Sequence, residues 1–179
     1  MITKNAVRDD GTVCRAIYSD CEQYRYDLVW RWSETDPLLV VWMLNPSTAT
    51  EIELDNTVKG ISSRARAQGY GGFRIINLFA YRDTDPWAMR KVQDPIGPHN
   101  DAVIRQVLKE AVAGGDTVVC GWGEHGNHNA RASAVADLAA ESGVTLHTYG
   151  INADKSPRHP LYTAHAKLPI AWVPDVAGA

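Results

Sequence analysis

Two asparagines follow or interrupt apolar segments at places where a ligand could reach them. Asn45 begins the segment Asn45–Thr48 directly after the apolar run Leu38–Leu44, and Asn77 interrupts the apolar segment Phe73–Phe79. A buried amide must find hydrogen-bonding partners or cost about 1–3 kcal/mol. Because an amide offers both a donor and an acceptor, Asn77 is suited either to bind the edge of a planar heterocycle or to tie two loops together. Segment 45–48 is either a ligand-binding loop or a simple turn whose polar side chains bond to nearby backbone.

A stiff and locally basic segment near the end of the chain carries a histidine. His159 lies between Pro157 and Pro160, inside a stretch from Lys155 to Lys167 that has three basic residues and no carboxylate. Such a stretch could contact phosphate, although a solvated charge cluster on an ordinary surface loop has the same composition. The two prolines restrict the loop, and this rigidity favours a functional role.

The cysteines and histidines do not form a recognisable metal site. Cys120, His125 and His128 offer three zinc ligands, but their spacing matches no standard pattern, and a cysteine inside a strand normally packs in the core. Glycines beside Trp122 would let a ligand or another part of the chain approach the backbone, or would serve tight packing around the indole. We therefore expect neither a metal nor another cofactor.

The composition indicates one ordinary globular domain. The 179 residues are 45% hydrophobic and 22% charged, which fits a single α/β domain spanning residues 1–179. A formal net charge of −3 argues against a generally basic nucleic-acid coat protein. Because the chain has three cysteines and lacks an apolar run of about 18 residues, we expect a cytoplasmic protein with free thiols.

Apolar periodicity and turn residues predict the elements that carry the polar segments. Residues 12–18 and 24–32 predict an antiparallel β-hairpin over about 12–32, and the core follows over about 38–173. Within the core we expect strands at 38–44, 73–79, 117–121 and 144–149, and helices at 57–68, at about 99–113 and from about 130 to Gly143. Asp83–Pro86 is typical of a helix-capping turn.

The alternation of strands and helices predicts the fold class. Successive β-α-β units connect parallel strands by right-handed crossovers, so we expect a three-layer α/β/α fold with a four-stranded parallel sheet, flanked by the N-terminal β-hairpin. Ligands of such sheets bind beyond the carboxyl ends of the strands. The segments that follow the four predicted strands are 45–50, 77–86, 121–129 and 150–165, and each is polar or rich in Gly and Pro.

Several short motifs carry a resemblance to known families. They are Leu44–Ala49, Gly69–Gly72, Asn77–Ala80, Asp85-Pro86, Trp122-Gly123 and Arg158–Tyr162. Together they resemble the family known as domain of unknown function 1643, over about residues 24–173, a name that implies no activity. More distantly, their order and placement are similar to those of the uracil-DNA glycosylase superfamily, which has a four-stranded parallel sheet between helices. That resemblance implies a uracil-DNA glycosylase-like fold.

The resemblance to uracil-DNA glycosylases also implies roles for particular residues. Asn45 takes the place of the residue that positions the attacking water, Asn77 that of the pyrimidine-binding Asn, and His159 that of the His that donates to pyrimidine O2. Asn45 and His159 would then be catalytic, and the substrate-binding residues would be Pro46, Ser47, Thr48, Asn77 and Phe79. The DNA-binding residues would be Lys155, Arg158, Leu161, Tyr162 and Lys167, with Leu161 or Tyr162 inserted into the base stack.

Two departures from that pattern shape the expected reaction. The uracil-specific branch has an aspartate at Asn45, and an amide cannot take a proton from water, which predicts modest turnover unless the leaving group is good. That branch also has a tyrosine at Ser47, and the smaller serine leaves room at pyrimidine C5.

The resemblance thus implies a hydrolase, a DNA glycosylase-like N-glycosidase. Its partner would be duplex or single-stranded DNA, from which it flips out and excises a modified or mismatched pyrimidine, such as 5-hydroxymethyluracil, uracil or thymine. The alternatives are an enzyme that acts on a free nucleoside or nucleotide, and a non-catalytic module that binds modified bases.

Overall fold

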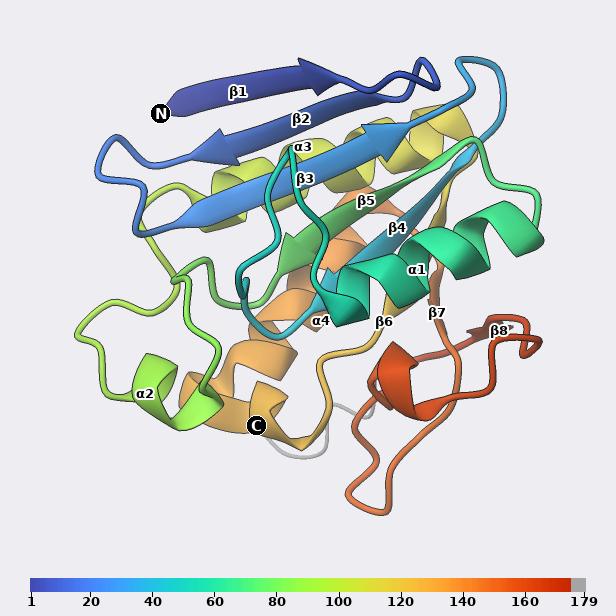
Figure 1. Cartoon of the computed structure of the whole chain (residues 1–179). Coiled ribbons are helices and arrows are strands. Elements are labelled where there is room, and N and C mark those ends of the chain that lie inside the picture. The colour runs from blue at the N-terminus through green and yellow to red at the C-terminus, as the bar shows by residue number, and fades with distance from the viewer. Residues whose placement is uncertain (175–179) are drawn as a thin grey trace.

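The computed structural model describes residues 1–174, in which eight strands form one sheet with helices on both faces (Figure 1). The strands are β1 (Ile2–Val7), β2 (Val13–Tyr18), β3 (Arg25–Arg31), β4 (Leu38–Met43), β5 (Gly72–Asn77), β6 (Thr117–Cys120), β7 (Leu146–Thr148) and β8 (Ile170–Ala171). The helices are α1 (Asn56–Ala67), α2 (Pro86–Arg90), α3 (Asn100–Gly114) and α4 (Arg131–Ser142), with 3-10 helices η1 (Glu124–Ala130) and η2 (Pro160–Tyr162). In space the strands follow the order β1-β2-β3-β5-β4-β6-β7-β8.

The sheet is mixed. Strand β4 pairs in parallel with both β5 and β6, and β6 pairs in parallel with β7. The other four pairings within residues 1–174 are antiparallel: β1 with β2, β2 with β3, β3 with β5 and β7 with β8. The α/β class is therefore confirmed, and the four predicted strands β4 to β7 do pair in parallel, but the prediction of a four-stranded parallel sheet is wrong because these strands are part of an eight-stranded mixed sheet.

The error arose at the two edges of the sheet. The predicted hairpin is confirmed as β2 and β3, yet it joins the main sheet through β5 instead of flanking it. Strand β1 contains the consecutive polar residues Thr3, Lys4 and Asn5, and β8 has only two residues. Neither segment has the apolar pattern that identifies a strand with a buried face.

Helices cover both faces of the sheet because both sets of alternating β4 side chains are apolar. Val40 and Trp42 belong to one core with α3 and α4, whereas Val41 and Met43 belong to a second core with α1. Figure 1 shows α1 in front of the sheet and α3 and α4 behind it. Burial on both faces explains why residues 38–44 form a continuous apolar run.

The three predicted helices are confirmed, with boundaries fixed by capping residues. The Asp55 side chain accepts a hydrogen bond from the Val58 N–H at the start of α1, and left-handed Gly115 and Gly143 end α3 and α4. The predicted capping turn is also confirmed, since the Asp85 side chain caps α2 and Pro86 is its first residue. Between residues 1 and 174, no helix combines the length and apolar character needed to span a bilayer.

The connections create an opening at one edge of the sheet. The chain leaves β4 toward α1 on one face, but it leaves the two neighbours of β4, β5 and β6, toward α3 and α4 on the other face. The loops after adjacent strands therefore diverge, which is the arrangement that opens a crevice at the carboxyl ends of the strands.

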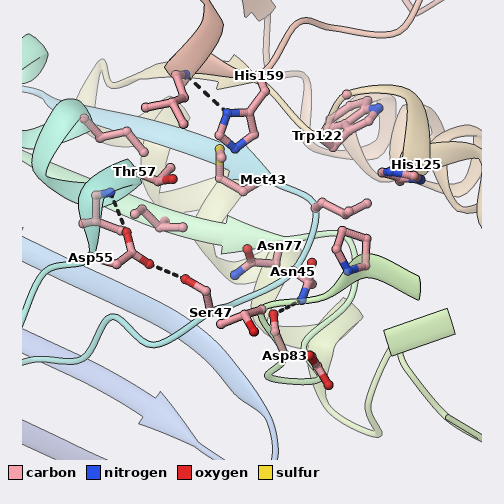
Figure 2. Close-up of a pocket in the computed structure, with 18 of the residues that line it drawn as sticks. Met43, Asn45, Ser47, Asp55, Thr57, Asn77, Asp83, Trp122, His125 and His159 are labelled. Atoms are coloured by element: carbon pink, nitrogen blue, oxygen red, sulfur yellow. Dashed lines mark hydrogen bonds between the residues drawn. The ribbon is translucent and has the colours of Figure 1, made fainter. Parts of the chain in front are cut away.

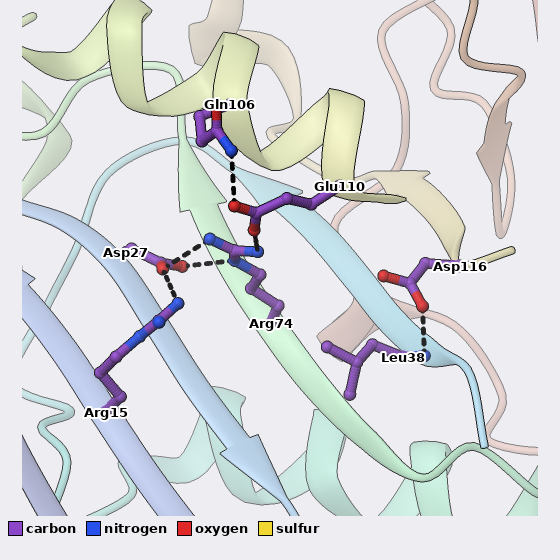
Figure 3. Close-up of polar contacts among 7 residues, drawn as sticks. All are labelled: Arg15, Asp27, Leu38, Arg74, Gln106, Glu110 and Asp116. Atoms are coloured by element: carbon purple, nitrogen blue, oxygen red, sulfur yellow. Dashed lines mark hydrogen bonds and ion pairs between the residues drawn. The ribbon is translucent and has the colours of Figure 1, made fainter. Parts of the chain in front are cut away.

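A buried ion cluster joins the hairpin to the rest of the fold on the α3 face (Figure 3). The Arg74 guanidinium donates to both oxygens of the fully buried Asp27, each at 2.8 Å, and its Nη1 donates to Glu110 of α3 at 2.5 Å. Arg15 of β2 donates to Asp27 at 3.1 Å. The cluster therefore links β2, β3, β5 and α3, and each buried charge has an opposite partner.

Arg74→Met is expected to lower the free energy of unfolding by about 3–5 kcal/mol, because it leaves the Asp27 carboxylate buried beside only Arg15. Urea denaturation followed by circular dichroism measures this change. Arg105→Met is the control, since the Arg105–Glu141 ion pair is exposed and contributes less than about 1 kcal/mol. Equal effects of the two substitutions would contradict a structural role for the cluster.

Candidate functional site

A pocket of about 540 Å³ lies at the carboxyl ends of β4, β5 and β6, on the α1 face of the sheet. Six of the residues predicted for the site line it: Asn45, Ser47, Asn77, His159, Leu161 and Tyr162. They come from the loop after β4, the end of β5 and the segment after β7. The sequence-based expectation that these distant segments meet in one place is confirmed, and the volume is in the range of small-molecule sites.

Asn77 is the last residue of β5, and its side chain reaches the pocket (Figure 2). The residue is 1% exposed, and neither its Nδ2 nor its Oδ1 has a hydrogen-bond partner among the described residues. Its backbone is fixed, because the buried Asn100 side chain donates to the carbonyl oxygens of Asn77 and Leu78 at 3.1 and 3.0 Å. The amide is thus held rigidly at the pocket, and both of its hydrogen-bonding atoms lack a partner among the described residues.

Asn45 lies next to Asp83 at the edge of the pocket. The Asn45 Nδ2 donates to the Asp83 carbonyl oxygen at 2.7 Å, and the Asp83 N–H donates to the Pro46 carbonyl oxygen at 2.9 Å. These two bonds tie the loop after β4 to the loop after β5. They orient the Asn45 amide and bring the half-buried Asp83, which also lines the pocket, close to it.

Ser47 is bound to the start of α1. Its hydroxyl donates to Asp55 Oδ2, while Asp55 Oδ1 accepts from the Val58 N–H at 2.8 Å. Asp55 also lines the pocket, so its carboxylate has two functions: it caps α1 and it anchors the loop that carries Ser47. A small side chain at position 47 leaves space in the pocket next to this carboxylate.

His159 is poised as a neutral hydrogen-bond donor. Its Nδ1 accepts from the Leu161 N–H at 3.2 Å, so the ring proton resides on Nε2, which faces the pocket (Figure 2). Burial lowers the pKa of His159 below 6.5, and the nearby Asp55 carboxylate opposes this shift without reversing it. The imidazole is therefore neutral at pH 7.

A buried arginine on α1 positions the His159 segment. Arg64 Nη2 donates to the Pro160 carbonyl and to the Thr163 carbonyl and hydroxyl at 3.0–3.3 Å, and its guanidinium lies 4.0 Å from the Tyr149 ring centroid. Pro160 also packs on Gly121, where a β-carbon would lie 2.6 Å from Pro160 Cδ. The glycine after β6 therefore permits close approach of the chain, one of the two roles expected for it.

Most of the chain matches one family. The family is described as protein of unknown function DUF1643, and the match covers residues 25–161. The chain belongs to this family. Neither the comparison with curated proteins nor that with solved structures found a match, so the predicted likeness to the uracil-DNA glycosylase fold gains no support from them. The DUF1643 region begins at Arg25 and contains every residue that lines the pocket except Tyr162.

Three residues of the DUF1643 region that were predicted to bind substrate lie outside this pocket. Phe79 is fully buried in the core with α3 and α4, because β5 ends at Asn77 and the following bend breaks the alternation that would have placed Phe79 beside Asn77. Pro46 is buried and contributes its carbonyl to Asp83. Thr48 is exposed and lines a separate hollow with Ser47 and Asp83.

The residues predicted to bind DNA fall into two groups. Leu161 and Tyr162 lie at the pocket and are 53% and 75% exposed, respectively. Lys155, Arg158 and Lys167 are exposed but do not line the pocket. Arg158 donates to the Asn152 side chain and the Ile151 carbonyl, both at 3.2 Å, which directs its guanidinium along the turn after β7.

Several pocket residues of the DUF1643 region had no counterpart in the sequence-based prediction. They are Arg25, Asp55, Asp83, Glu124 and Asn152, while His125 had been considered only as a zinc ligand. Asp55 is the N-cap of α1 and Asp83 lies two residues before the N-cap of α2, so the local sequence did not indicate their position at the pocket. Within residues 1–174 no group of three His, Cys, Asp or Glu side chains is arranged to bind a metal, and Cys120 is buried in the core.

The geometry at His159 predicts its titration. We expect the ring to titrate below pH 6.5 and to carry its proton on Nε2 at pH 7. Because the folded-state pKa is below that of the unfolded chain, the unfolded chain binds the proton more readily. The stability from the neutral ring is therefore present above the unfolded pKa and is lost as pH falls through the folded pKa.

Nitrogen-15 NMR of the imidazole measures both properties of His159, and loss of the signals in His159→Gln assigns them. Titration above pH 6.5 would contradict the effect of burial on the ring, and a proton on Nδ1 at pH 7 would contradict the hydrogen bond from the Leu161 N–H.

Proposed function

We propose that the protein is a DNA glycosylase-like N-glycosidase that excises a modified or mismatched pyrimidine. The observation that carries the proposal is the buried Asn77 amide, which lines the pocket with both its donor and its acceptor unpartnered. Uracil and thymine present adjacent O4 and N3–H groups. An amide can donate to the first and accept from the second, so a pyrimidine would complete both hydrogen bonds at once.

His159 supplies the group that the departing base requires. Cleavage breaks the bond between C1′ of the sugar and N1 of the base, and the bonding electrons leave with the base, whose negative charge spreads to O2. A neutral imidazole that donates from Nε2 would stabilise this charge as it develops, in the manner of an oxyanion donor. Exclusion of bulk water from the pocket when a base is bound would strengthen this hydrogen bond.

Asn45 and Asp83 together can orient the attacking water and accept its proton. The Asn45 Nδ2 is engaged by the Asp83 carbonyl, which leaves the amide oxygen to accept a hydrogen bond from water. The water oxygen forms the new bond to C1′, and its proton passes to a base. Asn45 cannot accept that proton, so we assign this step to the carboxylate of Asp83, a residue that lines the same edge of the pocket and whose Oδ1 accepts from the Asp85 N–H at 2.8 Å. Asp83 thus supplies the carboxylate missing from position 45.

The edge of the pocket suits a base that has been flipped out of a helix. The exposed apolar side chain of Leu161 and the Tyr162 ring stand next to His159, where one of them can fill the gap left in the stack. Ser47 leaves room for a substituent at C5, which favours modified pyrimidines such as 5-hydroxymethyluracil. These motifs follow one another along the chain in the same order as the uracil-DNA glycosylase motifs that they resemble.

The proposal predicts base excision that depends on two residues. The purified protein should leave abasic sites in oligonucleotides that contain 5-hydroxymethyluracil, uracil or mismatched thymine, measured as alkali-labile breaks on a gel. His159→Ala should lower the rate about 100- to 1000-fold, because the departing charge loses its donor. Asn45→Ala should lower it about 100-fold, because the water loses its orientation.

Matched controls are His165→Ala and Asn5→Ala, which alter exposed residues outside the pocket and should leave the rate unchanged. No abasic sites in any duplex or single strand, with the protein folded, would overturn the proposal. Release of base from free nucleosides alone would instead favour the nucleoside enzyme. Tight binding without product, unchanged by Asn45→Ala, would favour a binding module.

Asp83 has a separate test. Asp83→Asn keeps the backbone bond to Asn45 but removes the proton acceptor, so we expect kcat to fall about 100- to 10,000-fold with little change in KM. Asp9→Asn, in the exposed turn before β2, is the control. An unchanged kcat would exclude Asp83 as the base.

A further inference from the structure

The proposed function leaves one buried charged residue of the pocket without a task. Arg25 is the first residue of β3, is 2% exposed and lines the pocket. Its Nη1 donates to the Ala49 carbonyl, but its Nε has no hydrogen-bond partner. Among residues 1–174, none of the ion pairs includes Arg25. It is a buried cation that the protein does not neutralise by direct contact.

The other buried arginines of the fold have their partners within the protein. Arg74 binds Asp27 through two hydrogen bonds, and Arg131 pairs with Asp101. Arg64 has no carboxylate, but it donates to four acceptors and stacks on Tyr149. A buried guanidinium is costly unless it is paired or fully hydrogen-bonded. Arg25 meets neither condition, and it is the buried arginine that lines the pocket.

A bulge in the sheet turns Arg25 toward the pocket. In a regular strand Arg25 and Asp27 would lie on the same face, because side chains alternate. The register between β2 and β3 shifts at Ile17 and Tyr18, so that Ile17 lies opposite Asp27 and Tyr18 opposite Arg25. As a result Asp27 points to the α3 face, where it binds Arg74, whereas Arg25 points to the α1 face. Bulges near functional sites often redirect a side chain in this way.

The acidic residues near Arg25 are engaged elsewhere. The Asp55 carboxylate accepts from Val58 and Ser47, and the buried Glu51 accepts from the Tyr18 hydroxyl at 2.8 Å. Burial lowers the pKa of Arg25 to about 10, a shift that the charge of Asp55 opposes. The guanidinium therefore remains protonated at pH 7, and its charge is available to a ligand.

We infer that Arg25 binds an anionic oxygen group of the ligand, a carboxylate or a phosphate. The inference rests on the proposed function, since it assigns the charged group to a pyrimidine that Asn77 and His159 bind. Arg25 lies before the part of β3 that pairs with β5. Its backbone N–H donates to the Ala80 carbonyl oxygen at 2.9 Å, so its side chain enters the pocket at the Asn77 end. The anion is either an acidic substituent on the ring or the phosphate of a free nucleotide.

Isothermal titration calorimetry with four compounds separates these sources: uracil, 5-hydroxymethyluracil, 5-carboxyuracil and uridine 5′-monophosphate. We expect at least one of the two charged compounds to bind the wild-type protein about tenfold or more tightly than the neutral pyrimidines, because charge-assisted hydrogen bonds are stronger than neutral ones. Preference for 5-carboxyuracil places the anion on the ring, and preference for the nucleotide alone places it on the phosphate.

Arg25→Met should abolish the preference for the charged compound while changing uracil affinity by less than about threefold, because Asn77 and His159 remain. Arg66→Met, an exposed arginine of α1 outside the pocket, is the control. If Arg25→Met does not fold, Arg25→Lys should keep part of the preference, because the ammonium retains the charge but not the planar donors.

The outcomes distinguish this inference from the proposed function. Equal affinity of the wild-type protein for neutral and charged pyrimidines would overturn the role of Arg25 and leave the pyrimidine pocket intact. A preference for the charged compound that persists in Arg25→Met would also overturn it. Absence of binding by all four compounds, together with absence of base excision, would overturn both.

Discussion

The pocket depends on the register of β4 with its two neighbours. Backbone pairing places Met43 opposite Asn77 on one side and Trp42 opposite Cys120 on the other. Hydrogen bonds continue this register past the strand ends, since the N–H groups of Leu78 and Gly121 donate to the carbonyls of Met43 and Trp42 at 2.9 Å. A slip of β5 by one residue would turn the Asn77 amide to the opposite face of the sheet and replace it with an apolar side chain.

Helix termini and one helix interior then fix the loops that leave these strands. Asp55 at the start of α1 binds Ser47, Asn100 at the start of α3 binds the backbone after β5, and Arg64 within α1 binds the segment after His159. Each contact joins a loop to a helix that packs on the sheet. The side chains at the pocket are therefore positioned by the same interactions that close the two cores, which is how a site gains precise geometry.

Sequence reasoning located the parts of the site that follow from strand geometry alone. Asn45, Asn77 and His159 stand at or beyond the ends of apolar segments, and the carboxyl ends of neighbouring parallel strands meet at one edge of a sheet. Sequence reasoning placed Phe79 at the substrate on the resemblance to uracil-DNA glycosylases alone, whereas Phe79 lies in the core because β5 ends at Asn77 and the chain then bends. It also missed β1, whose polar residues carry no pattern of burial.

Arg25 and Asp83 were beyond sequence reasoning for a physical reason. The face on which Arg25 lies depends on a bulge, and the bulge depends on pairing between two strands that no local pattern reveals. Asp83 reaches the pocket because its backbone bonds to Pro46 and Asn45, residues nearly forty positions earlier in the chain. Local propensity could identify the capping turn beside Asp83 but not its partner loop.

The pairing of buried charges differs between the framework and the pocket. In the framework, buried charges such as Arg74 and Arg131 are paired within the protein, and these pairs connect elements that must stay together. In the pocket, the Asn77 amide and the Arg25 guanidinium keep hydrogen-bonding atoms without partners. Each of these groups destabilises the fold while it lacks a partner, and one ligand with a polar edge and an anionic group would satisfy both. Because both groups lie at one pocket, a ligand that bound there would remove the destabilisation that they cause.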